Sequence, residues 1–212
     1  KNPDASQPEV MKALTKVMEI KTKQVGIIDL DATLDIETVT EIFIRINSKG
    51  VVLNSADFAM SKIASYGEFG SQLRKFIDYF CHLAVQPHYF EIIKENDQEF
   101  AKTDYFRHIS WLRNDSSELY DPEYQDLIRV VGMTEFGRGR MDAVVSQLSG
   151  RDFETRTFDD DMATRSYEQL ERGLYDATNE HNFTQFLMII QSAGFINSSL
   201  ITSQNALKFA YA

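Results

Sequence analysis

The 212-residue sequence is 43% hydrophobic and 25% charged, a composition typical of a globular protein that buries a core. Its net charge of −10 argues against indiscriminate DNA binding, and no apolar run approaches the roughly 20 residues of a membrane helix. The single cysteine, Cys81, excludes an intramolecular disulfide and a cysteine-rich zinc site, so a cytoplasmic location fits best.

The first part of the chain predicts a helix, a strand and a second helix. Pro8 stands where a helix can begin, and apolar residues then recur at helical spacing as far as Ile20. Residues 23–30 are short, β-branched and bounded by polar residues, which predicts a strand. Asp35 can cap the next helix, whose apolar stripe covers residues 36–46.

Since the sequence lacks an initiator methionine, we expect it to begin inside a longer protein.

The rest of the chain predicts helices almost throughout. Ser55 can cap a helix that stops near Gly67, and Ser203 or Thr202 can start a last one. Between them, apolar residues recur at helical spacing in residues 69–80, 105–112, 127–131, 141–148, 162–174 and 183–190. Successive helical patterns begin near residues 65–68, which predicts a domain boundary there. We therefore expect a mainly α chain, in which residues 1–66 complete a small α/β module and residues 67–212 form a helical domain.

The sequence offers no recognisable metal site. None of the four histidines has the spacing of a metal-binding pair, and Pro87 interrupts any helix that would align His82 with His88. We therefore expect these histidines to have packing or surface roles. The acidic run of residues 159–161 suits the positive end of a helix better than a cation site.

Two arginines in a glycine-rich stretch form one candidate binding site. Arg138 and Arg140 alternate with Gly137 and Gly139, so two guanidinium groups could grip a DNA or nucleotide phosphate. The same stretch could be an ordinary turn between helices, its arginines neutralised by Glu135 and Asp142. Both interpretations remain open from the sequence, with the turn slightly favoured.

A second candidate site lies where the helix after Asp35 should end. A helix that ends in Asn47, Ser48, Lys49 and Gly50 can bring an amide, a hydroxyl and an ammonium group into one small volume. Such a corner could bind a phosphate or a nucleotide edge. Each residue also has a structural explanation, with Phe43 as a core anchor and Gly50 as a turn residue, and the two interpretations are evenly balanced.

The same segment carries a family resemblance. The stretch Phe-Ile-Arg-Ile-Asn-Ser-Lys-Gly at residues 43–50, followed by Leu-Asn-Ser-Ala-Asp at residues 53–57, resembles the N-terminal domain of GmrSD-type restriction endonucleases, a ParB-like module. The resemblance covers about thirty residues. The family's other motif, Asp-Gly-Gln-Gln-Arg, is absent from the sequence and would belong upstream of Lys1. A His-Asn-His nuclease pattern is absent too.

The resemblance implies a bacterial DNA-restriction or phage-defence protein that binds or hydrolyses nucleotide and acts on foreign or modified DNA. It implies nucleotide contacts by Phe43, Asn47, Ser48, Lys49 and Gly50, and DNA as a partner of the full-length protein. The full-length protein would then bind a nucleoside triphosphate together with a divalent cation. This chain would hold half of that site, and we expect it to be inactive alone. The alternative is a non-catalytic helical module for protein interaction or homodimerisation, which the acidity of the helical part also suits.

Overall fold

A computed structural model describes residues 6–24, 26–31, 34, 38–39, 42, 54–114, 119–152, 155, 157–195, 197, 200–201 and 203–212. The chain divides into two units, Lys1–Val39 and Thr40–Ala212. The described residues are mainly helical, which confirms the predicted mainly α class. None of the described helices has both the length and the apolar character to cross a membrane.

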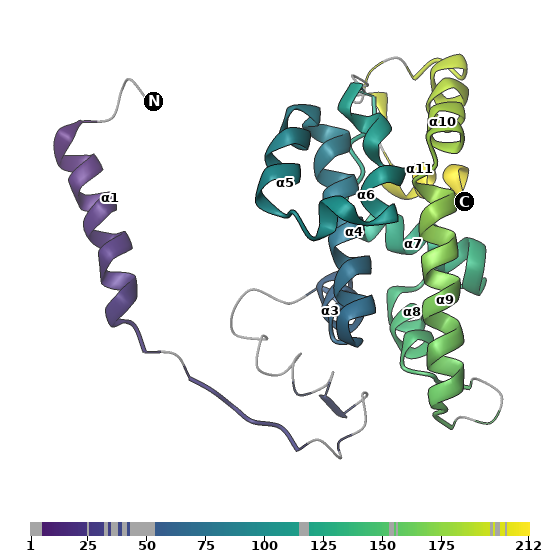
Figure 1. Ribbon diagram of the computed structural model, residues 1–212, viewed down its shortest axis with the longest axis horizontal. Coiled ribbons are helices and arrows are strands. Elements are labelled where there is room, and N and C mark those ends of the chain that lie inside the picture. Colours follow the sequence, from purple (N-terminus) through teal and green to yellow (C-terminus); the bar gives the residue numbers. More distant parts are fainter. Residues whose placement is uncertain are drawn as a thin grey trace. The chain divides into compact units, whose positions relative to one another are not determined.

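In the described part of the first unit, the amphipathic helix α1 covers Gln7–Glu19 and is followed by a short 3-10 helix over Ile20–Thr22 (Figure 1). This confirms the helix predicted after Pro8. The apolar side chains of α1 stay exposed, Met18 by 73% and Leu14 by 53%. Since these side chains are exposed, α1 gains little from packing, and an isolated helix of this length is marginally stable in water.

The strand predicted over residues 23–30 is wrong for the described residues of that stretch. Lys23 and Gln24 and residues 26–30 are neither strand nor helix, and Ile27 and Ile28 are 81% and 66% exposed. A strand requires backbone hydrogen bonds to a neighbouring strand, and no strand occurs among the described residues to supply them. The α/β module predicted before the helical domain therefore stays a prediction.

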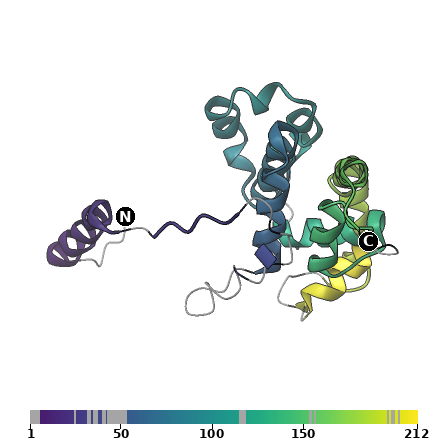
Figure 2. The ribbon, with the colours of Figure 1, turned by 90° about the horizontal axis from the view of Figure 1, so that it is seen from below.

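The second unit is built from packed helices (Figures 1 and 2). Among its described residues are the α-helices α3 (Ser55–Ala64), α4 (Gly67–Val85), α5 (Phe90–Asn96), α6 (Asp104–His108), α7 (Tyr124–Phe136), α8 (Met141–Leu148), α9 (Asp160–Ala177), α10 (Glu180–Ser192) and α11 (Gln204–Tyr211). Helix α7 contacts α3, α4, α8, α9 and α11, so it lies at the centre of the packing. Helix α3, which the sequence placed ahead of a boundary near residue 66, packs on α4 and α8 in this unit.

The core is rich in aromatic side chains. Phe76 and Phe80 of α4, Phe100, Tyr167 of α9 and Phe183 of α10 are almost completely buried. Phe80 and Phe183 meet edge to face with their centroids 5.6 Å apart, which joins α4 to α10. Each such ring removes a large apolar area from water, and aromatic pairs add about 0.5–1.5 kcal/mol beyond that burial.

Several helix boundaries follow their predicted caps. The acidic run of residues 159–161 lies at the start of α9, as predicted, where the Asp159 side chain accepts a hydrogen bond from the Asp161 N–H, and Ser203, one of the two predicted starts, caps α11. Helix α8 ends before Gly150, which has the positive φ of 80° that a stop glycine adopts. The helix predicted over residues 105–112 is instead divided, because α6 ends at His108 and a 3-10 helix covers Ser110–Asn114.

Candidate functional site

The predicted nucleotide corner lies outside the residues that the structure describes. This applies to Phe43, Asn47, Ser48, Lys49 and Gly50 alike, so their proposed roles stay predictions. The described chain resumes at Asn54, directly before α3.

The start of α3 is fixed by a reciprocal cap. The Asn54 Oδ1 atom accepts from the N–H groups of Ala56 at 2.8 Å and Asp57 at 2.9 Å, while the Asn54 N–H donates to Asp57 Oδ2 at 3.3 Å. The cap is therefore Asn54, and the prediction that Ser55 fills this role is wrong. An asparagine carbonyl at this position satisfies two of the helix's free N–H groups, and Ser55 becomes the first helical residue.

Asp57 also joins α3 to α7. Its Oδ1 atom accepts a hydrogen bond from the Tyr124 hydroxyl. This bond and burial raise the pKa of Tyr124 above its usual value, because both disfavour the phenolate. The segment that follows the predicted corner is thus anchored at its first turn, both locally and across the helical unit.

The arginine stretch forms the turn between α7 and α8. Gly137 has a φ of 62°, and the Arg138 N–H donates to the Gly132 carbonyl at 2.7 Å, which ends α7 in the manner of a glycine cap. A Cβ on Gly132 would lie 2.7 Å from the Arg138 carbonyl oxygen, so the close return of the chain requires glycine there. The predicted turn is confirmed.

Arg140 is already engaged by a neighbouring carboxylate. Its Nε and Nη2 atoms donate to Asp142 at 3.1 and 2.7 Å, and this pair raises the pKa of Arg140 and lowers that of Asp142. The expected second carboxylate, Glu135, pairs instead with Arg172 of α9. Phosphate would therefore compete with Asp142 for Arg140, and DNA binding by Arg138 and Arg140 stays a prediction.

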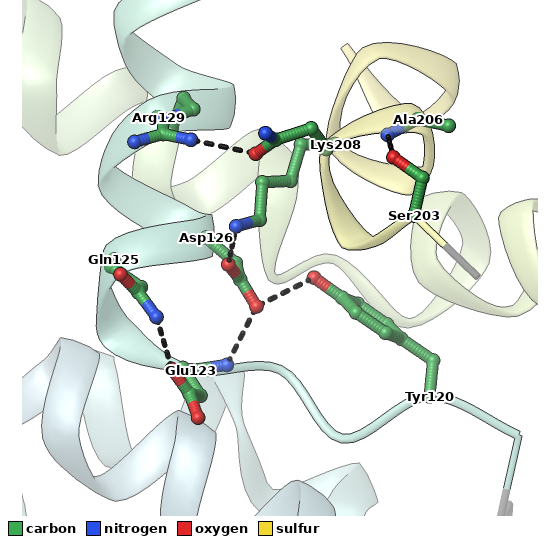
Figure 3. A network of polar contacts seen from close by, with 9 residues as sticks. Tyr120, Glu123, Gln125, Asp126, Arg129, Ser203, Ala206 and Lys208 are labelled. Atoms are coloured by element: carbon green, nitrogen blue, oxygen red, sulfur yellow. Dashed lines mark hydrogen bonds and ion pairs between the residues drawn. The ribbon is translucent and has the colours of Figure 1, made fainter. Parts of the chain in front are cut away.

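A buried polar network links α11 to the start of α7 (Figure 3). Lys208 Nζ lies 2.6 Å from Asp126 Oδ1, and the two side chains are only 7% and 6% exposed. The other carboxylate oxygen of Asp126 accepts from the Tyr120 hydroxyl at 3.2 Å and from the Glu123 N–H at 3.1 Å. Asp126 Oδ2 thus accepts two hydrogen bonds, and Oδ1 has the Lys208 ammonium group as its ion-pair partner, so the buried charge is compensated.

This network was not predicted from the sequence. Burial and the Asp126 charge raise the pKa of Tyr120, which keeps its hydroxyl protonated as a donor. Nearby, Arg129 Nη1 donates to Asn205 Oδ1 at 2.8 Å, a second polar link between α7 and α11. One sequence signal was available, because Lys208 is the sole lysine, arginine or acidic residue in residues 181–212. Because a buried lysine is almost always paired, an isolated lysine in a segment otherwise free of charge is a place to look for a buried ion pair.

A partly open cavity of about 350 Å³ lies among α7, α9, α10 and α11. The described residues that line it include Thr134, Glu135, Asp176, Gln185 and Tyr211. Its volume is in the range of small-molecule sites. Since its described lining contains no cysteine, serine or histidine, it offers no serine or cysteine nucleophile paired with a histidine base.

The titratable side chains of the core have packing contacts. Burial lowers the pKa of His108, whose ring meets Phe76 and Tyr175 edge to face, and burial raises the pKa of the Cys81 thiol. His82 and His88 both lie against Tyr89, at centroid distances of 4.7 and 4.4 Å. His82 and His88 are exposed, and their contacts with Tyr89 agree with the packing or surface roles expected for these two residues.

Within the described part of the chain, no group of three or more histidine, cysteine, aspartate or glutamate side chains could hold a metal ion. No protein-family model, curated protein or solved structure matches this sequence or fold.

Proposed function

We propose that the chain is part of a bacterial DNA-restriction or phage-defence protein that binds or hydrolyses nucleotide and acts on foreign or modified DNA. In this proposal, Phe43, Asn47, Ser48, Lys49 and Gly50 contribute half of a nucleotide site, and the helical unit is its non-catalytic support. The observation that carries the proposal is the match of residues 43–50 and 53–57 to the GmrSD-type stretch.

The contacts of α3 support this arrangement indirectly. A half-site works only if it is held in place, since binding geometry must be accurate to about 0.5 Å. The Asn54 cap and the Tyr124–Asp57 hydrogen bond give the residue immediately after residues 43–53 a fixed position in the helical unit. The support is a rigid attachment point, while the nucleotide chemistry rests on the sequence motif.

Nucleotide hydrolysis by the natural full-length protein tests the proposal. We expect turnover of a nucleoside triphosphate that changes when modified DNA is added, and we expect Asn47→Ala to abolish it because the amide would position the nucleotide. Asn96→Ala, at the exposed end of α5, is the matched control and should leave turnover unchanged. A full-length protein without turnover, or with equal turnover in both variants, would overturn the proposal.

Two further observations test the half-site and the missing motif separately. The 212-residue chain alone should not hydrolyse nucleotide, so turnover by this chain that Asn47→Ala abolishes would contradict the half-site. The coding sequence upstream of Lys1 should encode Asp-Gly-Gln-Gln-Arg. Its absence there would instead favour the alternative of a helical interaction module.

A further inference from the structure

The cavity of about 350 Å³ among α7, α9, α10 and α11 has both apolar and polar walls. Val130 of α7 and Phe186 and Ile189 of α10 supply large apolar side chains. The polar side chains of its described lining are those of Thr134, Glu135, Asp176, Asn182, Gln185 and Tyr211. A cavity of this size with a few polar groups can hold a small organic ligand, and the polar groups decide which kind.

Most hydrogen-bond donors of this lining are used inside the protein. Thr134 Oγ1 donates to a main-chain carbonyl one turn earlier in α7, at 3.2 Å, and the Tyr211 hydroxyl donates to the carbonyl of the last residue of α9. Asn182 Nδ2 donates to another carbonyl of α9 at 2.9 Å. Since a hydroxyl has one proton, Thr134 and Tyr211 can offer a ligand only lone pairs, and Asn182 offers mainly its oxygen. The amide of Gln185 can still donate or accept.

Two carboxylates add acceptors and negative charge to the same lining. Both hydrogen bonds from Arg172 reach Glu135 Oε2, so Glu135 Oε1 has no hydrogen-bond partner among the described residues. The carboxylate of Asp176, on the exposed side of α9, has neither a hydrogen bond nor an ion pair within that part of the chain. The described lining contains no lysine or arginine. Two negative charges therefore face one neighbouring cation, Arg172.

Glu135 is held in place before any ligand arrives. Its side chain is only 14% exposed, and Arg172 of α9 grips it from one side. A Cβ on Gly173 would lie 2.6 Å from Glu135 Cγ, so the absence of a side chain on Gly173 gives Glu135 its room against α9. A carboxylate that is already fixed loses little conformational entropy when it binds a ligand.

We infer that this cavity binds a small organic cation, an ammonium or guanidinium ion that carries an apolar portion. Such a cation brings three to five N–H donors and no acceptor, which complements a lining with many free acceptors and few free donors. Its apolar portion would lie against Phe186 and Ile189. The two carboxylates would repel an anion, and the net charge of −10 attracts cations to the chain. The inference is independent of the proposed nucleotide function, because it uses residues 130–211 alone.

Isothermal titration calorimetry of the 212-residue chain with phenethylammonium tests the inference. We expect saturable binding with a dissociation constant of about 1 mM or lower. Phenethyl alcohol and phenylacetate have nearly the same size and replace the cation by a neutral group and an anion. The alcohol should bind at least about tenfold more weakly, and phenylacetate should not bind at about 10 mM. Equal affinity for the amine and the alcohol, or tighter binding of phenylacetate, would overturn the inference.

Two variants place the ligand in this cavity. Asp176→Asn and Glu135→Gln each remove one charge with almost no change of shape, and each should raise the dissociation constant at least about tenfold. Asp176 is exposed, so its variant should fold normally, which circular dichroism would verify.

Glu95→Gln is the matched control, because Glu95 is an exposed carboxylate on α5, which contributes no residue to the described lining. It should leave the dissociation constant unchanged. A wild type without saturable binding up to about 10 mM phenethylammonium would overturn the inference. So would a Glu95→Gln chain that binds as weakly as Asp176→Asn, because the cation would then respond only to the overall charge.

Discussion

Lys208 Nζ and Asp126 Oδ1 lie 2.6 Å apart in the interior, and they join the last helix of the chain to the first turn of α7. Each charge is buried, so each depends on the other for the solvation that water would otherwise supply. The pair fixes α11 against α7.

Removing the lysine should therefore strongly destabilise the helical unit. We expect Lys208→Met to lower the free energy of unfolding by about 3 kcal/mol, because the Asp126 carboxylate stays buried without its cation. Urea denaturation measures this change. Lys94→Met is the control, since Lys94 is 55% exposed and pairs with Glu91 at 3.5 Å on the surface. Its effect should stay below about 1 kcal/mol, and equal losses in the two variants would contradict the assigned role of the buried pair.

Local features of the fold were predictable from the sequence. The helix start at the acidic residues 159–161 and the start at Ser203 were predicted because each depends on residues within one helical turn. The predicted strand over residues 23–30 was wrong because strand formation depends on a partner far away in the sequence, which β-branched composition does not reveal.

In the candidate sites too, contacts between residues close in the sequence were predictable, and contacts between distant residues were not. The turn containing Arg138 and Arg140 followed from its glycines, and the Arg140–Asp142 pair from closeness in sequence. The partner of Glu135 was not predictable, because Arg172 lies on another helix. The Asp126–Lys208 pair also joins distant segments, and helical periodicity says which face is buried but not which charges meet there.

A side chain at Gly70 should lower the stability of the helical unit. A Cβ at Gly70 would lie 2.0 Å from the Ile63 carbonyl oxygen, where α3 and α4 meet. We expect Gly70→Ala to cost about 1–3 kcal/mol of stability despite the better helix propensity of alanine, because backbone must move. Thermal unfolding measures this cost. Gly139→Ala provides the comparison, since its Cβ would meet only Met133 at 3.5 Å, and a similar loss there would refute the steric explanation.

Asp97 should contribute to stability at neutral pH and lose that contribution in acid. Burial alone would raise its pKa, but Lys75 at 2.7 Å, the Phe100 N–H and the Tyr79 hydroxyl outweigh burial and lower the pKa. Because the folded pKa is below the unfolded value, the contribution is complete above about pH 4 and disappears as pH falls through the folded pKa.

Chemical denaturation of Asp97→Asn at several pH values tests this. The stability difference from wild type should be largest near about pH 6 and should shrink below about pH 4. Asp142→Asn is the control. Arg140 lowers the pKa of Asp142 too, but the Asp142 side chain is 61% exposed. Because solvent screens the pair, Asp142→Asn should change stability much less than Asp97→Asn. A pH-independent loss in Asp97→Asn would show that packing, not charge, explains its role.

His108 should make the helical unit less stable in mildly acidic solution. Burial against Phe76 and Tyr175 lowers its pKa below the usual value of about 6.5, so the unfolded chain takes up a proton at a higher pH than the folded chain does. Stability is therefore expected to fall as pH drops below about 6.5, until the folded pKa is reached. His108→Phe should reduce this slope between about pH 7 and pH 5, whereas His88→Phe, at an exposed position, should not. An unchanged slope in His108→Phe would mean that other groups cause the acid sensitivity.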